Sequence, residues 1–138
     1  MDDIIYVDMV GDLFHFGHVA YLKDCKAMGK TLKVGVHNDA DVKSYKRQPI
    51  LTMEERIKVI EACKYVDEVV PNAPLKVTKD FVKLHNIKRI CHGDDISQKC
   101  INDMYSDVAD ILFFIPYTKG ISTTNLIERI KEHLQIKI

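Results

Sequence analysis

The chain has 138 residues, a length typical of one domain that buries roughly two thirds of the surface its unfolded form exposes. Twenty basic and twenty acidic side chains give a formal net charge of zero. This balance excludes a global field that would attract nucleic acid or an anionic membrane, so any anion site must be built locally.

The four cysteines have neither a Cys-x-x-Cys pair nor a metal-ligand spacing. Cys25, Cys63 and Cys91 fall within apolar patterns, so we expect reduced thiols, mostly in the core. The first residues are not a basic region followed by an apolar one, and no apolar run approaches the ~20 residues of a membrane span. We therefore expect a cytoplasmic protein.

The first predicted strand covers 4–7 and leads into the segment 8–18, which contains two histidines three residues apart. A helix is predicted from Gly17, because apolar residues recur at helical spacing, and Gly29 is expected at its C′ position. A second strand is predicted over 32–36. Asn38 or Asp39 then caps a short helix that ends before Pro49.

Thr52 and Glu55 form a capping-box pattern at the start of the next predicted helix. A third strand is expected over 66–70, a helix from Thr78, a fourth strand over 89–91 and a fifth over 111–115. Ser122 or Thr123 then caps a final helix. This alternation predicts a Rossmann-like α/β three-layer sandwich with a five-stranded parallel sheet, formed by a single domain over 1–138.

In such a sheet the polar segments after strands one, two, four and five meet at the edge where ligands bind. His15 and His18 are predicted to direct their rings toward the helix entrance, where they can donate hydrogen bonds to phosphate oxygens. Two surface histidines at a helix start are the alternative. The basic segment 43–47, which includes Lys46, is either a solvated loop or a clamp for phosphates.

A second phosphate-binding signal is the segment 120–124, where a glycine and three hydroxyl residues precede a helix. Ordinary N-capping requires only one hydroxyl. Asp94 and Asp95 follow the fourth strand and either bind a ribose hydroxyl, a base amino group or an acceptor substrate, or form a tight turn. Asp12 can bind a metal ion, accept from an amino group or orient its turn. Arg56 can pair with a glutamate or reach a carboxylate.

These segments, in this order, resemble the cytidylyltransferase family over about residues 5–129. The family's His-x-Gly-His is similar to 15–18, its loop lysine to Lys46 and its Gly-Ile-Ser-Thr-Thr/Ser signature to 120–124. The segments 52–56, 64–71 and 92–96 especially resemble those of the ethanolamine-phosphate and choline-phosphate enzymes.

The resemblance implies that CMP is transferred from CTP to a small phosphorylated or phosphonate amino alcohol, with release of pyrophosphate. Ethanolamine phosphate is favoured; aminoethylphosphonate, choline phosphate and glycerol phosphate are alternatives. It implies Mg²⁺ bound mainly through the phosphates of CTP, without a dedicated protein metal site, and a homodimer. A nucleotidyltransferase that uses ATP or another nucleotide, and a catalytically degenerate nucleotide-binding module, remain alternative interpretations.

The roles implied for individual residues fall into three groups. The catalytic group is His15, His18 and Lys46. The nucleotide-binding group is Val10, Gly11, Gly17, Asp94, Tyr117, Thr118, Lys119, Gly120, Ile121, Ser122 and Thr123. The acceptor-binding group is Asp12, Asp95 and Arg56.

The chain departs from the family pattern at identifiable positions. Its residues 9–12 exchange the glycine and the bulky residue of the family's Gly-x-Phe-Asp. Its residues 117–120 lack the arginine of the family's Arg-Thr-Glu-Gly and carry Lys119 in place of the acid. Leu75 replaces an aromatic residue of the choline enzymes, and a quaternary ammonium favours an aromatic face. The amphipathic tail of animal choline enzymes is also not present, so we expect no stable membrane anchor.

Overall fold

The computed structural model describes residues 3–116 and 120–135. Five parallel strands form one sheet in the order β3-β2-β1-β4-β5. They are β1 (Ile4–Met9), β2 (Thr31–Val36), β3 (Glu68–Val70), β4 (Ile87–Gly93) and β5 (Leu112–Ile115). The helices are α1 (Phe16–Lys26), α2 (Asp39–Tyr45), α3 (Met53–Glu61), α4 (Lys79–Leu84), α5 (Gln98–Met104), the 3-10 helix η1 (Ser106–Ile111) and α6 (Thr123–Gln135). The predicted Rossmann-like α/β architecture is confirmed.

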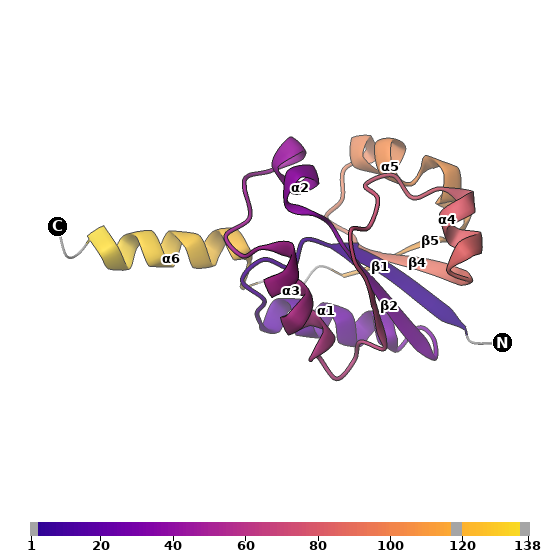
Figure 1. Cartoon of the computed structure of the whole chain (residues 1–138), viewed down its shortest axis with the longest axis horizontal. Coiled ribbons are helices and arrows are strands. Elements are labelled where there is room, and N and C mark those ends of the chain that lie inside the picture. Colours follow the sequence, from indigo (N-terminus) through magenta and orange to yellow (C-terminus); the bar gives the residue numbers. More distant parts are fainter. Residues whose placement is uncertain (1–2, 117–119, 136–138) are drawn as a thin grey trace.

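The central strand β1 is buried on both faces, and alternate residues enter two different cores. Ile5 and Val7 pack with side chains of α1 and α3 on one face. Ile4 and Tyr6 pack on the other face with Val77 and with side chains from α4, α5 and η1. Figure 1 shows the same three layers, with α1 and α3 on one side of the sheet and α4 and α5 on the other.

Three predicted helix starts are confirmed by side-chain capping. Asn38 accepts from the backbone N–H of Asp41 and Thr78 accepts from that of Phe81. Thr52 and Glu55 form the reciprocal capping box at α3. These helices begin where the sequence predicts, because a local hydroxyl or amide satisfies N–H groups that lack a partner within the helix.

The prediction for Gly29 is wrong. Helix α1 already ends at Lys26, and its C-cap residue Ala27 keeps right-handed backbone angles. A Cβ atom at Gly29 would lie 2.6 Å from the carbonyl oxygen of Asp3. Gly29 is therefore required by the close approach of two backbones and not by a left-handed helix end.

The sequence analysis predicts no helix between the fourth and fifth strands. The structure has two there, α5 and η1. Ser97 caps α5 by accepting from the N–H of Cys100. The two buried residues that follow, Tyr105 and Val108, anchor this connection to the second core. This connection places the hydroxyl of Tyr105 against Asp8 of β1.

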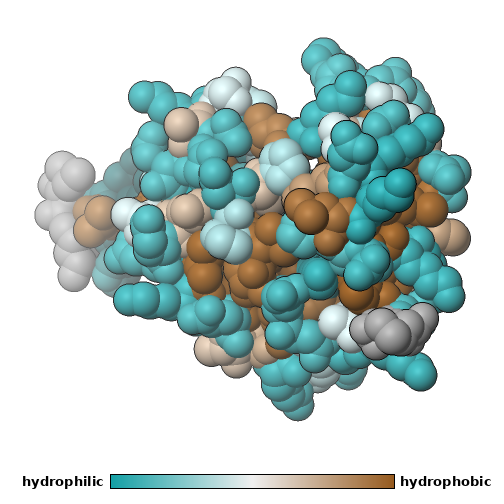
Figure 2. All heavy atoms as spheres, turned by 45° about the vertical axis from the view of Figure 1, so that its right-hand side comes forward, coloured by the Kyte–Doolittle hydropathy of each residue, from teal (hydrophilic) through white to brown (hydrophobic). Residues whose placement is uncertain are grey.

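Helix α6 extends away from the body of the domain (Figure 1). None of its residues is buried, and Ile130 and Leu134 are half exposed. Hydrophilic side chains cover most of the face drawn in Figure 2, with apolar ones reaching the surface near its middle. Within the described residues, no helix combines the length and the hydropathy that crossing a membrane requires.

Two of the predicted core thiols lie at the interface of α1 and β4. Cys25 and Cys91 are fully buried, and their sulfur atoms are 2.8 Å apart. The hydrogen bond to Cys91 and the burial raise the pKa of the Cys25 thiol. Cys25 therefore stays protonated and acts as a packing residue.

Candidate active site

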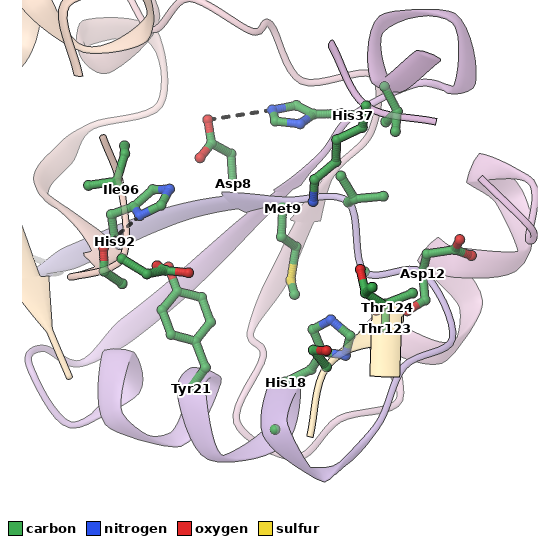
Figure 3. A pocket seen from close by; sticks show the side chains of 18 of the residues that line it. Asp8, Met9, Asp12, His18, Tyr21, His37, His92, Ile96, Thr123 and Thr124 are labelled. Atoms are coloured by element: carbon green, nitrogen blue, oxygen red, sulfur yellow. Dashed lines mark hydrogen bonds and ion pairs between the residues drawn. The ribbon is translucent and has the colours of Figure 1, made fainter. Parts of the chain in front are cut away.

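A cavity of about 580 Å³ opens beyond the carboxyl ends of the strands. Its walls come from the ends of β1, β2 and β4, from α1, α2 and α5, and from the start of α6. The chain leaves β1 toward β2 on one side and returns to β4 on the other, so this is the point where the strand order reverses. Figure 3 shows the side chains converging on this cavity.

A tight turn over residues 10–15, called the motif turn below, connects β1 to α1. Gly11 has a φ of +70°, which an L side chain rarely adopts, and Leu13 also has a positive φ of 48°. A Cβ atom at Gly11 would lie 2.6 Å from Cδ1 of Ile60 in α3. The exchanged glycine therefore occupies a position where both the backbone conformation and the packing require it.

His15 and His18 form an imidazole version of a capping box at the start of α1. Nδ1 of His15 accepts from the N–H of Gly17, and Nδ1 of His18 accepts from the N–H of His15, each at 3.1 Å. Since both Nδ1 atoms are acceptors, a neutral ring carries its proton on Nε2. The capping bonds thus leave two Nε2–H groups as donors for an anion in the cavity.

Burial shifts both histidines toward the neutral form. It lowers the pKa of His15, and it lowers the pKa of His18 to about 4, with further lowering from the nearby charges of His15 and Lys46. His18 also stacks on Phe14, with ring centroids 5.2 Å apart. Gly17 lacks a side chain where a Cβ atom would lie 2.8 Å from the ring of His15.

Asp12 is held within the protein. Its two carboxylate oxygens accept from the N–H groups of Ile50 and Leu51 at 2.9 and 3.0 Å. Lys46 lies at the start of the same connection, just after α2, and lines the cavity with an exposed side chain. Asp12 therefore fixes the far end of the loop that carries Lys46.

The start of α6 lines the cavity beside the motif turn. Ser122 accepts from the N–H of Asn125 at 3.0 Å and so caps the helix, as the sequence predicts. The hydroxyl of Thr123 donates to the carbonyl oxygen of Asp12 at 2.9 Å. This bond joins two segments that are 111 residues apart in the sequence. The turn that precedes the histidines and the hydroxyl-rich helix start thus form one surface.

Arg56 is fully buried beside the cavity. Its guanidinium donates to the carbonyl oxygens of Val10 and Leu51 at 2.6 and 3.2 Å and pairs with Asp39 at 2.6 Å. These contacts join the motif turn, the loop before α3 and the start of α2. They use the guanidinium for positioning the backbone of the site.

The structure brings most of the predicted site residues together. The cavity is lined by Val10, Gly11, Asp12, His15, Gly17, His18, Lys46, Asp95, Ile121, Ser122 and Thr123. Asp94, Gly120 and Arg56 lie near it but outside its lining. Tyr117, Thr118 and Lys119 lie outside the described residues.

Sequence reasoning missed a second, buried polar cluster in the same cavity. Asp8 lies near the end of β1, His37 directly follows β2, and the two residues are only 6% and 4% exposed. Oδ2 of Asp8 lies 3.5 Å from Nε2 of His37 (Figure 3). The hydroxyl of Tyr105 donates to the other oxygen of Asp8, and Tyr45 lies 3.3 Å from Nδ1 of His37. The pairing of β1 with β2 was the available signal, because Asp8 pairs with Gly35 and His37 follows two residues later, on the same face of the sheet.

Comparison with known proteins identifies the same family that the sequence motifs resemble. The model of the family described as cytidylyltransferase-like matches residues 11–129. The chain is 34% identical over 137 residues to the probable ethanolamine-phosphate cytidylyltransferase of Schizosaccharomyces pombe, covering 97% of this chain and 38% of that one. It is 39% identical over 132 residues to the choline-phosphate cytidylyltransferase of Saccharomyces cerevisiae, covering 91% of this chain and 31% of the other.

Among solved structures, the lipopolysaccharide core biosynthesis protein of Thermoplasma volcanium is similar in fold, with a TM-score of 0.67 and 22% identity. The similarity covers 88% of this chain and all of that one. The chain thus spans between three and four tenths of the length of the two curated relatives above.

Proposed function

Because this chain belongs to the cytidylyltransferase-like family, we propose that it transfers CMP from CTP to ethanolamine phosphate, as the names of its relatives suggest. A phosphate oxygen of the acceptor attacks the α-phosphorus of CTP, the bond to the β-phosphate breaks, and pyrophosphate leaves. The observation that carries the proposal is the pair of Nε2–H donors of His15 and His18 at one cavity with Lys46.

These donors act on the charge that grows on the transferred phosphoryl group and on the leaving pyrophosphate. Phosphoryl transfer is accelerated mainly by positioning and by electrostatic stabilisation. His15 and His18 are fixed by their capping bonds before any ligand binds, which lowers the cost of arranging them. Lys46 has an exposed side chain, so its ammonium can move to stay in contact with the phosphates during the reaction. Gly11, Gly17 and the α6 start are proposed to hold the triphosphate.

Mg²⁺ is part of the proposal through the nucleotide. Within residues 3–116 and 120–135, no group of three His, Cys, Asp or Glu side chains is placed to hold a metal ion. The carboxylate of Asp12 is occupied by two backbone N–H groups. This donor set fits an ion that is carried mainly by phosphate oxygens, where it would reduce the repulsion between the two anionic reactants.

For the acceptor, we propose that the ammonium group binds at the acidic end of the cavity. Asp8 is buried there with Tyr105 and His92, and Asp95 lines the same region. A buried carboxylate requires a compensating charge or hydrogen bonds, and an ammonium supplies both. Choline phosphate is the second candidate, because a choline-phosphate enzyme is 39% identical to this chain.

The quaternary arrangement and the cellular compartment belong to the same proposal. We expect a homodimer, to which the exposed apolar residues of α6 and Phe16 are suited, and a cytoplasmic enzyme of phospholipid synthesis. Analytical ultracentrifugation measures the oligomeric state. A sedimentation coefficient of the 15.9 kDa monomer at all concentrations would contradict the homodimer.

The test of the activity is pyrophosphate release from each of CTP, ATP, GTP and UTP with Mg²⁺. Each nucleotide is combined with ethanolamine phosphate, aminoethylphosphonate, choline phosphate and glycerol phosphate. We expect release with CTP and ethanolamine phosphate, and a CDP-linked product by mass spectrometry. Turnover with ATP alone contradicts the choice of nucleotide. Tight CTP binding without release for any acceptor points to a nucleotide-binding module instead.

A further inference from the structure

The pair formed by Asp8 and His37 has unused hydrogen-bonding capacity. Among the described residues, neither Oδ2 of Asp8 nor Nε2 of His37 has a hydrogen-bond partner, although both atoms are buried. Buried polar atoms without a partner are costly and rare in folded proteins. Both residues line the cavity. The two atoms lie 3.5 Å apart, so one ligand group with several N–H donors can lie beside both and donate to each.

The remaining atoms of the pair are already engaged, which fixes their orientation. Tyr105 donates to Oδ1 of Asp8, and the backbone N–H of His37 donates to the carbonyl oxygen of Met9 at 3.2 Å. Nδ1 of His37 lies 3.3 Å from the hydroxyl oxygen of Tyr45. If Nδ1 carries the proton and donates to Tyr45, then Nε2 presents a lone pair to the cavity.

We infer that His37 determines the choice of acceptor by pairing with Asp8 as a second acceptor for the N–H groups of a primary ammonium. The inference rests on the proposed function and adds a specificity-determining residue to it. A primary ammonium has three N–H donors, so it can donate to Asp8 and His37 at once. A trimethylammonium has none. It would leave Nε2 of His37 buried without a partner while still being attracted to the charge of Asp8.

The expected preference for ethanolamine phosphate over choline phosphate follows from this difference in N–H donors. A site built around a hydrogen bond discriminates strongly against a ligand that lacks the donor, because a buried acceptor then stays unpaired. We expect the wild-type chain to prefer ethanolamine phosphate over choline phosphate by about 100-fold or more in kcat/KM. Dimethylethanolamine phosphate, which keeps one N–H, is expected to lie between them.

The experiment compares wild type with His37→Leu, His37→Gln, Tyr45→Phe and the matched control His133→Leu, whose histidine is exposed on α6. The KM of each acceptor and of CTP is measured by pyrophosphate release. In His37→Leu we expect the preference for the primary ammonium to fall to about 10-fold or less, with the change in the acceptor KM and not in the KM of CTP. His37→Gln keeps an acceptor oxygen and is expected to restore part of the preference.

Binding separates this inference from the proposed activity. The affinity of each acceptor is measured by calorimetry with a CTP analogue that cannot be cleaved between its α- and β-phosphates. Binding selectivity that His37→Leu abolishes, without turnover in wild type, would refute the activity and support the role of His37. The inference is overturned if wild type does not prefer the primary ammonium in binding, or if His37→Leu keeps the full preference. Should His37→Leu not fold, Tyr45→Phe provides the test, because it removes the hydroxyl that orients the imidazole of His37: a weaker preference supports the inference, and unchanged selectivity overturns it.

Discussion

The imidazole rings of His15 and His18 lie with their centroids 3.9 Å apart at the entrance of α1. Two positive charges at this distance repel each other, and His15 accordingly contributes to the lowered pKa of His18. The rings are close because each accepts a backbone N–H of the same turn. Their structural role as caps can therefore be separated from their chemical role as donors.

Replacing His18 with asparagine tests this separation. The side-chain oxygen of asparagine can accept the N–H of His15 as Nδ1 does, whereas no group replaces Nε2–H. We expect kcat to fall by about 100-fold or more, because one fixed donor to the transition state is lost. The melting temperature should stay near that of wild type. Near-normal turnover in both His18→Asn and His15→Asn would remove the histidines from the mechanism.

The lowered pKa of His18 predicts how the stability of the folded protein depends on pH. Its pKa lies near 4 in the folded protein and near 6.5 in an unfolded chain. Between these values the unfolded chain binds a proton that the folded protein does not, so stability decreases as the pH falls from about 6.5 to 4. The full effect of such a shift is up to about 3 kcal/mol.

Urea unfolding at pH 7.0 and 4.5 measures this effect. We expect wild type to lose more stability than His18→Asn over this interval. The exposed His133 provides the control, and His133→Asn should lose as much as wild type. Parallel losses in wild type and His18→Asn would show that His18 is not the group responsible.

Much of the site was predictable because its parts are local. The caps at Asn38, Thr52 and Thr78 follow from side chains within three residues of the N–H groups they satisfy. The histidine motif follows a strand and opens a helix, so its place at the ligand edge follows from the parallel topology. The glycine at 11 departed from the family pattern, and its positive φ together with the packing of Ile60 explains it.

Long-range contacts were beyond sequence reasoning. Tyr105 reaches Asp8 across 97 residues, from a connection whose short helices show no clear apolar period. For the same reason Arg56 was expected to bind the acceptor, whereas its contacts with Val10, Leu51 and Asp39 are visible only in three dimensions. The acceptor roles of Asp12, Asp95 and Arg56 stay predictions.

Gly11 and Gly120 form a matched pair for testing the motif turn. Both have positive φ, of 70° and 95°, so alanine is strained at either position. At Gly11 an added Cβ also meets Ile60 at 2.6 Å, whereas at Gly120 it meets nothing within 4 Å. We expect Gly120→Ala to cost about 1 kcal/mol of unfolding free energy and Gly11→Ala about 2 to 4 kcal/mol.

The companion variant Ile60→Val removes the atom nearest to the new Cβ. If the contact with Ile60 causes the excess cost, Gly11→Ala should be less destabilising in the Ile60→Val background than in wild type. Equal costs of the two glycine substitutions in chemical denaturation would assign the requirement at Gly11 to backbone conformation alone.

Arg56 is expected to act on the site through the backbone it holds. Replacement by methionine keeps most of the side-chain volume but removes its donors to Val10 and Leu51 and its ion pair with Asp39. Because buried carbonyl oxygens are then left without a partner, we expect a loss of about 3 to 5 kcal/mol in unfolding free energy. Lys58→Met, at an exposed position of the same helix, should change stability by less than about 0.5 kcal/mol.

The kinetics of Arg56→Lys distinguish positioning from direct contact with the acceptor. Lysine keeps a positive charge but cannot hold Val10, Leu51 and Asp39 together, since its ammonium lacks the planar fork of arginine. If Arg56 positions the turn beneath the nucleotide, the KM of CTP should rise with the KM of the acceptor. If Arg56 binds the acceptor, only the acceptor KM should rise. The structure favours the first result, because the side chain of Arg56 is fully buried and its donors are engaged by Val10, Leu51 and Asp39.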